Sequence, residues 1–556
     1  MTENILVAVA WPYANSSLHL GHVAGAYLPA DIFARYHRCK GNNVIMISGS
    51  DQHGTPVTLS AEAEGKTPAE IADKYHRLFL EDFKRLGISW DLFTSTRTDN
   101  HKKVAQDMFS SLVEKGYIYK KATFQPWCDK CNRFLPDRYV EGICPNCKSA
   151  GARGDQCEKC GKPVNAAELI DSRCRICGTP PFEKESEHFF LKLSAFEKPL
   201  LQWVKAQSHW RPNVHNFTAR FLEEGLNDRA ITRDIEWGVP LPIPGYAGKC
   251  LYVWFEAVVG YLSASMEWAK STGDSDAWRK YWDGSAKGYY FIGKDNIPFH
   301  TIIWPAMLMG YGGLSLPFDV PANEFLTIES QKFSKSRRIA VWVSDYFERY
   351  QADPLRYFLS ATMPESSDTD FSWSEFVRRN NDELVATFGN LVQRVLTFTH
   401  SKFDAMVPSP GAIDSVSQEL INKAHTAIEE IGKQIEKCHF REALRYAMVL
   451  AQEGNRYLDE RAPWKAIKED RQSAALSLYV AITIISALKT ALYPFLPFTS
   501  EKLHVYLGLE GGAEADGWKL RMPLVGTHLP SPQILFPKLD DSLIDEEMKR
   551  MGLGAN

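Results

Sequence analysis

The order of apolar and polar segments in the first 60 residues is the feature that most constrains the fold of this chain. Residues 5–11 (ILVAVAW) are apolar without a break, as in a strand buried on both faces, and a polar turn follows. Residues 18–38 carry apolar side chains at helical spacing, and residues 44–48 repeat the buried-strand pattern before the polar turn SGSDQHGTP. This order predicts a doubly wound α/β domain, which binds its ligands at the carboxyl ends of parallel strands.

Length and charge limit the remaining possibilities. At 556 residues the chain is too long for one core, so three or more structural units are expected. The 64 basic and 68 acidic side chains give a formal net charge of −4, which argues against a protein that coats nucleic acid but allows a local basic face. The N-terminal apolar run lacks a basic leader and a cleavage site, and no stretch is expected to reach the about 20 apolar residues of a membrane span. The sequence therefore predicts a cytoplasmic protein.

Eight of the eleven cysteines form Cys-x-x-Cys pairs, namely Cys128/Cys131, Cys144/Cys147, Cys157/Cys160 and Cys174/Cys177. A reducing compartment makes disulfides the weaker interpretation and metal binding the stronger one. Eight thiolates suffice for two tetrahedral zinc sites, which would be structural because they leave no ligand position open. Loop-closure cost favours pairing neighbours in order, but only by fractions of a kcal/mol. Taken alone, the segment is also compatible with a zinc-containing nucleic-acid reader.

Changes of pattern along the chain predict its organisation. Cysteine pairs and short turns interrupt the α/β pattern, and beyond about residue 382 apolar residues recur at helical spacing, which predicts a helical bundle. The Gly- and Pro-rich tail is expected to be irregular. The predicted sections are the α/β domain in two halves (1–116 and 235–325), a zinc-binding insertion (117–234), a contact region with a lysine-rich loop (326–382), the helical bundle (383–508) and the tail (509–556).

The stretch ANSSLHLGHV at residues 14–23 places His19 and His22 on one face of a helix start. Free backbone N–H groups and the helix dipole favour an anion there. The alternative is one core histidine and one that caps the turn; a metal site is disfavoured, because no third ligand lies nearby in sequence. Far along the chain, the loop KFSKS carries Lys332 and Lys335, which suit a polyphosphate and its leaving pyrophosphate. The two motifs together favour a nucleotide site.

The motifs also indicate a family. HLGH resembles the HIGH motif, and KFSKS the KMSKS loop, of class I aminoacyl-tRNA synthetases, with apolar Leu20 and Phe333 at the positions that differ. Within that class, the segments WPYANSSLHLGH, SDQHGTP, YVWFEAVVGY, FIGKDNIPFH and ERAPW and the four cysteine pairs are similar to the methionyl-tRNA synthetases over nearly the whole chain. The resemblance implies a Rossmann-like parallel-sheet catalytic domain with a zinc-binding insertion, followed by an all-α anticodon-binding domain.

The resemblance implies an activity as well. L-Methionine would react with ATP, assisted by Mg²⁺, to give methionyl-adenylate and pyrophosphate, and the 3′ end of tRNA(Met) would then accept the methionine. The substrate carboxylate attacks phosphorus directly, so the protein has to position groups and stabilise charge. The resemblance assigns His19 and His22 to the phosphates and Lys332 and Lys335 to the departing pyrophosphate. The other residues that it places along ATP are Gly293, Lys294 and Asp295.

Individual positions match the remaining sites of the family. A thioether suits an apolar, aromatic cavity, and the matching residues are Tyr13, Trp254, Tyr261 and His300, with Asp51 on the α-ammonium group. Trp11 and Val258 stand in this pocket where relatives carry Leu and Pro. The family nests the cysteines, with Cys144, Cys147, Cys157 and Cys160 on one zinc and Cys128, Cys131, Cys174 and Cys177 on the other. Proteins recognise single-stranded bases by stacking them on aromatic side chains. The residues that match the anticodon-reading positions of the family are Asn390, Arg394 and Trp464.

Two other classes of protein fit parts of the sequence. A small-molecule nucleotidyltransferase would share the histidine site but has no use for the long helical section, and a non-catalytic zinc-containing RNA-binding protein has no use for the paired phosphate motifs. The isoleucyl, valyl and leucyl enzymes need room for a large editing domain, whereas cysteine pairs fill this insertion. A monomer is expected, because the sequence stops at EEMKRMGLGAN without the further C-terminal domain through which many relatives dimerise.

Overall fold

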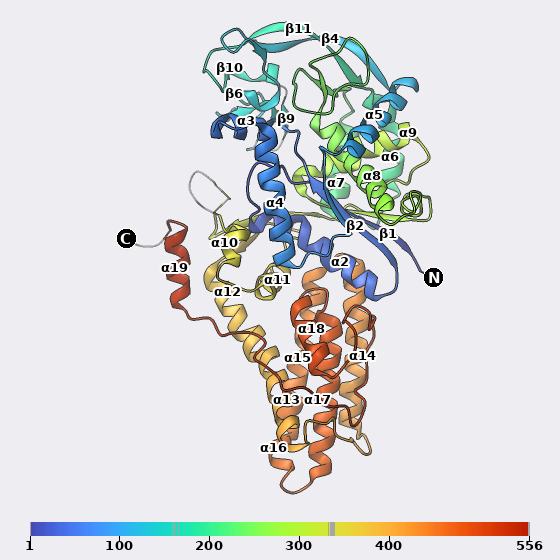
Figure 1. The fold of residues 1–556 in the computed structure, drawn as a ribbon, viewed down its shortest axis with the longest axis vertical. Helices are drawn as coiled ribbons and strands as arrows, with labels where there is room; N and C mark the ends of the chain where they lie inside the picture. Colours follow the sequence, from blue (N-terminus) through green and yellow to red (C-terminus); the bar gives the residue numbers. More distant parts are fainter. Residues whose placement is uncertain are drawn as a thin grey trace.

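A parallel sheet of five strands, in the order β16-β15-β1-β2-β3, forms the centre of the upper half of the molecule (Figure 1). The computed structural model describes residues 2–157, 159–160, 162–164, 166–331, 333 and 340–553. All four strand pairs are parallel, and Val7 of β1 lies between Tyr289 of β15 and Met46 of β2. The predicted α/β fold is confirmed. The strands are β1 Asn4–Val9, β2 Asn43–Ser50, β3 Leu92–Ser95, β15 Lys287–Gly293 and β16 Ala322–Asn323.

Both faces of this sheet are buried, because successive side chains of a strand point to opposite sides. Ile5 and Val7 of β1 belong to a core that continues into the C-terminal helices, whereas Leu6 and Ala8 belong to a second core on the other face. The prediction of a strand buried on both faces is therefore correct. The helices that pack around the sheet are α1 Leu20–His22, α2 Leu28–Cys39, α3 Thr55–Glu64, α4 Pro68–Leu86, α5 Asp99–Glu114, α8 Val253–Ser271 and α9 Trp304–Tyr311.

A long antiparallel pair carries the cysteine-rich segment at the top of the molecule (Figure 1). It consists of β4 (Ile118–Cys128) and β11 (Phe182–Leu191), which pair from Ile118 opposite Leu191 to Trp127 opposite Phe182. Short strands and two helices complete this part: β5 Arg133–Phe134, β6 Val140–Ile143, β7 Ala152–Arg153, β8 Asp155–Gln156, β9 Pro163–Val164, β10 Ile170–Cys174, α6 Glu197–Lys205, α7 Pro212–Glu223, β12 Arg229–Ala230, β13 Thr232–Arg233 and β14 Cys250–Leu251.

The C-terminal part is helical, as predicted. Two short parallel strands and two helices lead into it: β17 Leu326–Ile328, α10 Val343–Phe347, α11 Ala352–Ala361 and β18 Thr369–Phe371. The helices that follow are α12 Trp373–Arg379, α13 Asn390–Lys402, α14 Ser415–Glu436, α15 Phe440–Arg461, α16 Pro463–Ala466, α17 Arg471–Leu492 and α18 Pro497–Tyr506.

Two expectations for this part are wrong. Helix α17 is long and apolar enough to cross a membrane, but its apolar window is entirely buried, because α17 forms the core of the bundle. The tail is not wholly irregular, since it contains α19 (Ser542–Arg550). The buried Glu547 of α19 accepts hydrogen bonds from Arg349 at 2.7 and 2.9 Å and from the Tyr350 hydroxyl at 2.8 Å, which fastens this helix to the segment between α10 and α11.

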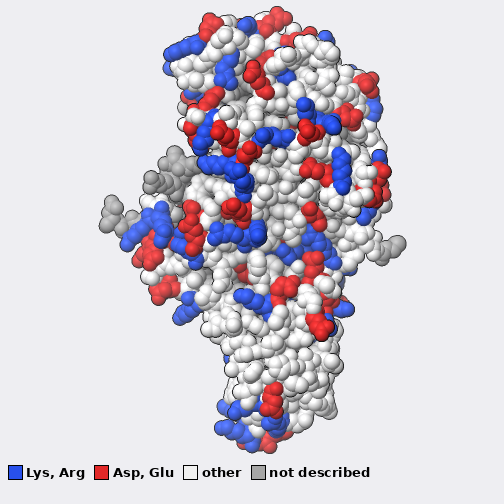
Figure 2. Space-filling model, in the orientation of Figure 1, with Lys and Arg blue, Asp and Glu red and all other residues white. Residues whose placement is uncertain are grey.

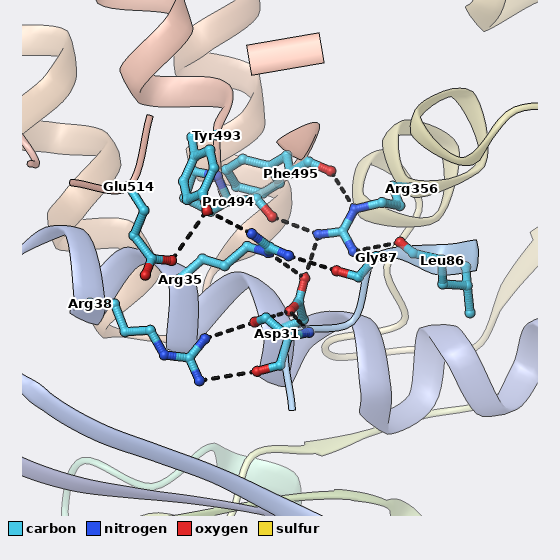
Figure 3. A network of polar contacts seen from close by, with 11 residues as sticks. Asp31, Arg35, Arg38, Leu86, Gly87, Arg356, Tyr493, Pro494, Phe495 and Glu514 are labelled. Carbon is cyan, nitrogen blue, oxygen red and sulfur yellow. Dashed lines mark hydrogen bonds and ion pairs between the residues drawn. The ribbon is translucent and has the colours of Figure 1, made fainter. Parts of the chain in front are cut away.

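A buried ion cluster joins α2 to the bundle (Figure 3). The Asp31 carboxylate accepts hydrogen bonds from Arg35 at 2.9 Å and from Arg356 of α11 at 2.7 Å. Both guanidinium groups also donate to carbonyl oxygens at the ends of α4 and α17, namely those of Leu86, Gly87, Pro494 and Phe495. Helix carboxyl ends carry partial negative charge. The negative charge of one carboxylate and the partial negative charges of two helix ends therefore offset the positive charges of two buried arginines.

Candidate active site

The first helix after β1 starts with a mutual cap between the two histidines of HLGH. The Nδ1 of His19 accepts from the Gly21 N–H at 3.1 Å, and the Nδ1 of His22 accepts from the His19 N–H at 3.2 Å. Their ring centroids are 3.8 Å apart. A neutral imidazole that accepts at Nδ1 carries its hydrogen on Nε2. Capping thus favours, in both rings, the form with its hydrogen on Nε2, which is a donor suited to an anion.

The structure brings HLGH together with Phe333, the one described residue of KFSKS. The His19 ring stacks on Phe333 at a centroid distance of 3.9 Å and an interplanar angle of 22°. The chain beyond the loop returns to the same place, where the Leu20 N–H donates to the Val341 carbonyl and the Val343 N–H donates to the Leu18 carbonyl. The predicted juxtaposition of the two motifs is therefore correct. Lys332 and Lys335 themselves lie outside the described residues.

The carboxyl ends of β1 and β2 meet beside HLGH. Tyr13 and Asp51 form a parallel β-bridge there. The Asp51 N–H donates to the Pro12 carbonyl and the Ala14 N–H donates to the Asp51 carbonyl, both at 2.8 Å. The Asp51 carboxyl group is buried. Burial and the negative charge of Glu256 raise the pKa of Asp51 well above its usual value. A buried carboxylate without a cation is costly, so this position favours a positively charged ligand group.

Aromatic rings of the predicted methionine pocket lie next to one another. Trp254 contacts Tyr13 edge to face at 6.1 Å and stacks on Phe299 at 3.9 Å. The Tyr261 hydroxyl and the His300 Nε2 are 2.7 Å apart, and the His300 Nδ1 lies 2.9 Å from the Asn296 carbonyl. Burial lowers the pKa of His300 to about 4. His300 is therefore neutral, donates from Nδ1 and accepts the Tyr261 hydrogen. Phe299 was not predicted from the sequence, although it lies within the FIGKDNIPFH segment.

The unusual Trp11 is accommodated by two glycines. A β-carbon on Gly49 would lie 2.3 Å from the Trp11 ring, and one on Gly260 would lie 2.7 Å from it, so neither position has room for a side chain. Gly49 belongs to β2 and Gly260 to α8, the helix that also carries the buried Val258. The indole thus fills the space between the sheet and α8, which explains how a tryptophan fits where leucine is expected.

The predicted ATP residues form the turn after β15. Gly293 ends the strand, and Lys294 and the exposed Asp295 follow in a 3-10 turn. The Lys294 ammonium lies 2.7 Å from Glu324 and 2.8 Å from Asp368. A cavity of about 900 Å³ lies beside this turn and reaches the cysteine-rich insertion, with Trp254, Lys294, Asp295, Phe299, Cys157 and Cys160 in its lining.

The eight paired cysteines form two separate groups, with the four outer residues in one and the four inner residues in the other. This is the nested grouping, and the expectation from loop closure that neighbours pair in order is wrong. The Sγ–Sγ distances are 3.4 Å (Cys128–Cys177), 3.9 Å (Cys131–Cys174), 3.9 Å (Cys144–Cys160) and 3.7 Å (Cys147–Cys157). A tetrahedral zinc with bonds of about 2.3 Å requires about 3.8 Å between sulfurs.

Local hydrogen bonds favour the thiolate at some of these cysteines, whereas burial raises the pKa of Cys131 and Cys174. The hydroxyl and backbone of Thr179 lower the pKa of Cys177 to about 6. Burial raises the pKa of Cys157, but hydrogen bonds, of which the one with the Ser149 hydroxyl contributes most, lower this pKa to about 6. The thiolate is the form that binds metal. Both groups therefore fit zinc in geometry, and each contains a cysteine whose thiolate is favoured.

The predicted anticodon residues lie at one end of the helical bundle. Asn390 and Arg394 are exposed one turn apart on α13, and the Arg394 guanidinium lies over the Trp464 ring at 4.6 Å and 2.8 Å from Asp459. Figure 2 shows Lys and Arg side chains at the lower tip, where α16 lies; the exposed Lys465 belongs to that helix. A half-buried indole with a cation on it is suited to stack with a nucleobase.

Sequence reasoning missed a buried polar cluster next to Asp51. Glu256 of α8 lies between His53 and His101, at 3.0 Å from the first and 2.5 Å from the second. All three side chains are buried. The one available signal was Glu256 itself, a charged residue in the otherwise apolar segment YVWFEAVVGY.

These features define a class of protein. A parallel sheet with HLGH after its first strand, and with Phe333 of KFSKS stacked on that motif, fits the class I aminoacyl-tRNA synthetases. The family described as "tRNA synthetases class I (M)" matches residues 5–396, and the one described as "Anticodon binding domain of methionyl tRNA ligase" matches residues 407–554. The chain belongs to the methionyl-tRNA synthetase family.

Individual relatives agree with this assignment. A methionine–tRNA ligase of Dehalococcoides mccartyi (strain CBDB1) is 65% identical over 553 residues, with both chains covered in full, and one of Thermomicrobium roseum is 52% identical over 99% of each chain. The methionyl-tRNA synthetase of Mycobacterium tuberculosis in complex with methionyl-adenylate has a similar structure, with a TM-score of 0.80 and 27% identity over 97% of this chain and 100% of that one.

Proposed function

We propose that this chain is a methionine–tRNA ligase, which activates L-methionine with ATP and transfers it to the 3′ end of tRNA(Met). The observation that carries the proposal is the contact between His19 and Phe333, because it joins the two phosphate motifs beside a pocket that ends in Asp51. The relatives named methionine–tRNA ligase, one of them 65% identical over the full chain, support the same activity.

The proposed roles follow from the chemistry of each group. The Nε2–H groups of His19 and His22 stabilise negative charge on the phosphates as the methionine carboxylate attacks, and Asp51 holds the α-ammonium group. Lys332 and Lys335 neutralise the leaving pyrophosphate. The turn of Gly293, Lys294 and Asp295 contacts ATP, which enters with Mg²⁺, and the pocket for the thioether is formed by Trp11, Tyr13, Trp254, Val258, Tyr261 and His300.

The experiment that tests this function is exchange of pyrophosphate into ATP by the purified wild-type chain. Methionine is expected to support exchange without tRNA, because adenylate formation precedes transfer. Isoleucine, valine and cysteine are the matched amino acids, and exchange with any of them in place of methionine would overturn the proposal. Charging of tRNA(Met), and not of a tRNA with another anticodon, completes the test.

Zinc binding is proposed for both cysteine groups. The wild-type chain is expected to hold two zinc ions in native mass spectrometry, and Cys157→Ser and Cys177→Ser are each expected to remove one of them, since a structural site rarely survives loss of one ligand. One zinc in the wild type would contradict the proposal for one of the groups. Such reduced cysteines suit the cytoplasm, which is the proposed location. A single chain of 63.0 kDa is the proposed assembly, to be checked by light scattering.

Trp464 is proposed to stack on an anticodon base, together with Asn390 and Arg394. Trp464→Ala is expected to lower kcat/KM for tRNA charging by about 10- to 100-fold, the effect of losing one base–aromatic stack. Pyrophosphate exchange by the same variant is the control and is expected to stay within about twofold, because α16, the helix that contains Trp464, lies at the far end of the bundle (Figure 1). An equal loss of both activities would remove Trp464 from the anticodon site.

A further inference from the structure

The buried cluster of Glu256, His53 and His101 joins three elements that surround the methionine pocket. His53 belongs to the turn after β2, His101 to α5 and Glu256 to α8. The His53 Nδ1 binds one carboxylate oxygen of Glu256 at 3.0 Å, and the His101 Nε2 binds the other at 2.5 Å. The backbone N–H of His53 also donates to the Asp51 carboxylate at 3.3 Å. One residue thus connects the Glu256 cluster directly to Asp51.

Both ring nitrogens of His101 have hydrogen-bond partners. The Nε2 binds Glu256, and the Nδ1 lies 2.9 Å from the Ser263 hydroxyl, which is also 3.1 Å from the Gly260 carbonyl. Burial alone would raise the pKa of Glu256, but His53 and His101 lower it to about 2, so Glu256 is an ionised acceptor. The cluster therefore holds an ionised carboxylate between two histidine side chains.

Within the cluster both histidine side chains bind Glu256, and Asp51 accepts only the backbone N–H of His53 from it. In the part of the chain that the structure describes, Asp51 forms no ion pair. The other titratable or charged groups around the cluster are Tyr13 after β1, His76 of α4, Arg97 before α5, Arg233 of β13, Glu236, Cys250 of β14, and Tyr261 and Glu267 of α8.

We propose that Glu256, held by His53 and His101, is a positioning residue of the methionine site that fixes both the place and the charge of Asp51. The proposal rests on the proposed function. Glu256 ties the turn that carries Asp51 to the helix that carries Trp254 and Tyr261, so that the ammonium group and the thioether of one substrate meet their partners together. It also adds a negative charge behind Asp51.

The test compares Glu256→Gln with Glu267→Gln in methionine-dependent pyrophosphate exchange. Glu267 is the matched control, because it lies on the same helix and links it to the sheet edge through the Thr94 hydroxyl at 2.8 Å. Glu256→Gln is expected to raise KM for methionine by about tenfold or more, the effect of losing a charged hydrogen-bond partner, with kcat and KM for ATP within about twofold. Glu267→Gln is expected to leave all three values within about twofold.

The pH dependence of KM for methionine distinguishes an effect on the ionisation of Asp51 from a general loosening of the site. Asp51 must be ionised to bind the ammonium group, so KM for methionine rises at low pH with the apparent pKa of this site. Glu256→Gln removes a neighbouring negative charge and is expected to move that apparent pKa to lower pH. His101→Gln replaces one of the two side chains that hold Glu256 but keeps the Glu256 charge, and is expected to raise KM for methionine without moving that apparent pKa to lower pH.

A shift of the apparent pKa to lower pH in Glu256→Gln, with a raised methionine KM in both variants, supports the proposal, and the methionine KM of His101→Gln keeps it testable if Glu256→Gln does not fold. Equal changes of kcat and of both KM values, or a shift to higher pH in Glu256→Gln, would overturn it, because a general structural defect changes all three kinetic values alike. A wild-type chain without methionine-dependent exchange would overturn the proposed function and this inference together. Normal wild-type exchange with an unchanged methionine KM in Glu256→Gln would overturn the inference alone.

Discussion

Replacement of His22 by alanine is expected to slow methionine-dependent pyrophosphate exchange by about 10²- to 10³-fold, the usual effect of removing one donor that stabilises a transition-state oxyanion. The His22 Nδ1 accepts from the His19 backbone, so the ring is held with its Nε2–H as the donor. A donor fixed before the reaction needs no reorganisation when charge develops on the phosphate. The measurement is kcat at saturating methionine and ATP, with circular dichroism to confirm the fold.

Alanine also removes the cap of the first helix, so two further variants separate capping from catalysis. Gln and Glu at this third helical position both accept from the backbone N–H of the capping residue. His22→Gln offers an amide donor to the phosphates and is expected to recover part of the lost rate. His22→Glu keeps the cap but presents an anion, and is expected to be as slow as alanine or slower. Equal exchange by the Gln and Glu variants would show that His22 acts only on the helix start.

Much of the fold could be predicted because its signals are local. The buried strands of residues 5–9 and 44–48 are continuous apolar runs, and the bundle helices repeat apolar residues at helical spacing. Helix α19 could not be predicted in this way, because its segment SLIDEEMKR has few apolar residues and is anchored by the contacts of Glu547 with Arg349 and Tyr350. The length of the apolar segment in α17 was underestimated, because polar and charged residues near the ends of the helix flank its long apolar centre.

The residues of the candidate site also fall into two groups: those that a local motif predicts and those that come together only in the folded chain. His19 and Phe333 belong to motifs with fixed spacing, so their sequence predicts a common site, and the structure adds only that the two rings stack. Contacts across the chain carry no local signal. Nothing in the sequence around Trp11 indicates that Gly49 and Gly260 make room for it, and nothing links His53 to His101 before Glu256 brings them together. Partners of this kind are visible only once the chain is folded.

The ion cluster between α2 and the bundle supports the second large prediction. Asp31→Asn is expected to lower the free energy of unfolding by about 3–5 kcal/mol, because it leaves the guanidinium groups of Arg35 and Arg356 buried without their carboxylate. Arg356 is fully buried and cannot reach solvent by a change of rotamer. Urea unfolding followed by circular dichroism and tryptophan fluorescence measures the loss, and the part of the transition that includes the bundle is expected to move most.

The pH dependence of stability tests the same cluster. Burial raises the pKa of Asp31, but the charges of Arg35 and Arg356 outweigh burial and lower it to about 2. Because this pKa lies below the usual value of about 4, the contribution of Asp31 is complete above pH 4 and is lost as the pH falls toward 2. Asp31→Asn is therefore expected to remove part of the acid sensitivity of the wild type over that interval.

An exposed ion pair across the same junction provides the control. Lys40 follows α2 and pairs with Glu436 of α14, and both side chains are more than a third exposed. Glu436→Gln is expected to cost at most about 1 kcal/mol, because solvent screens such pairs. If the two variants lost equal stability, burial would not be what makes the Asp31 cluster strong. A larger loss in Asp31→Asn would mean that the junction is held by the desolvated charges and not by the number of ion pairs that cross it.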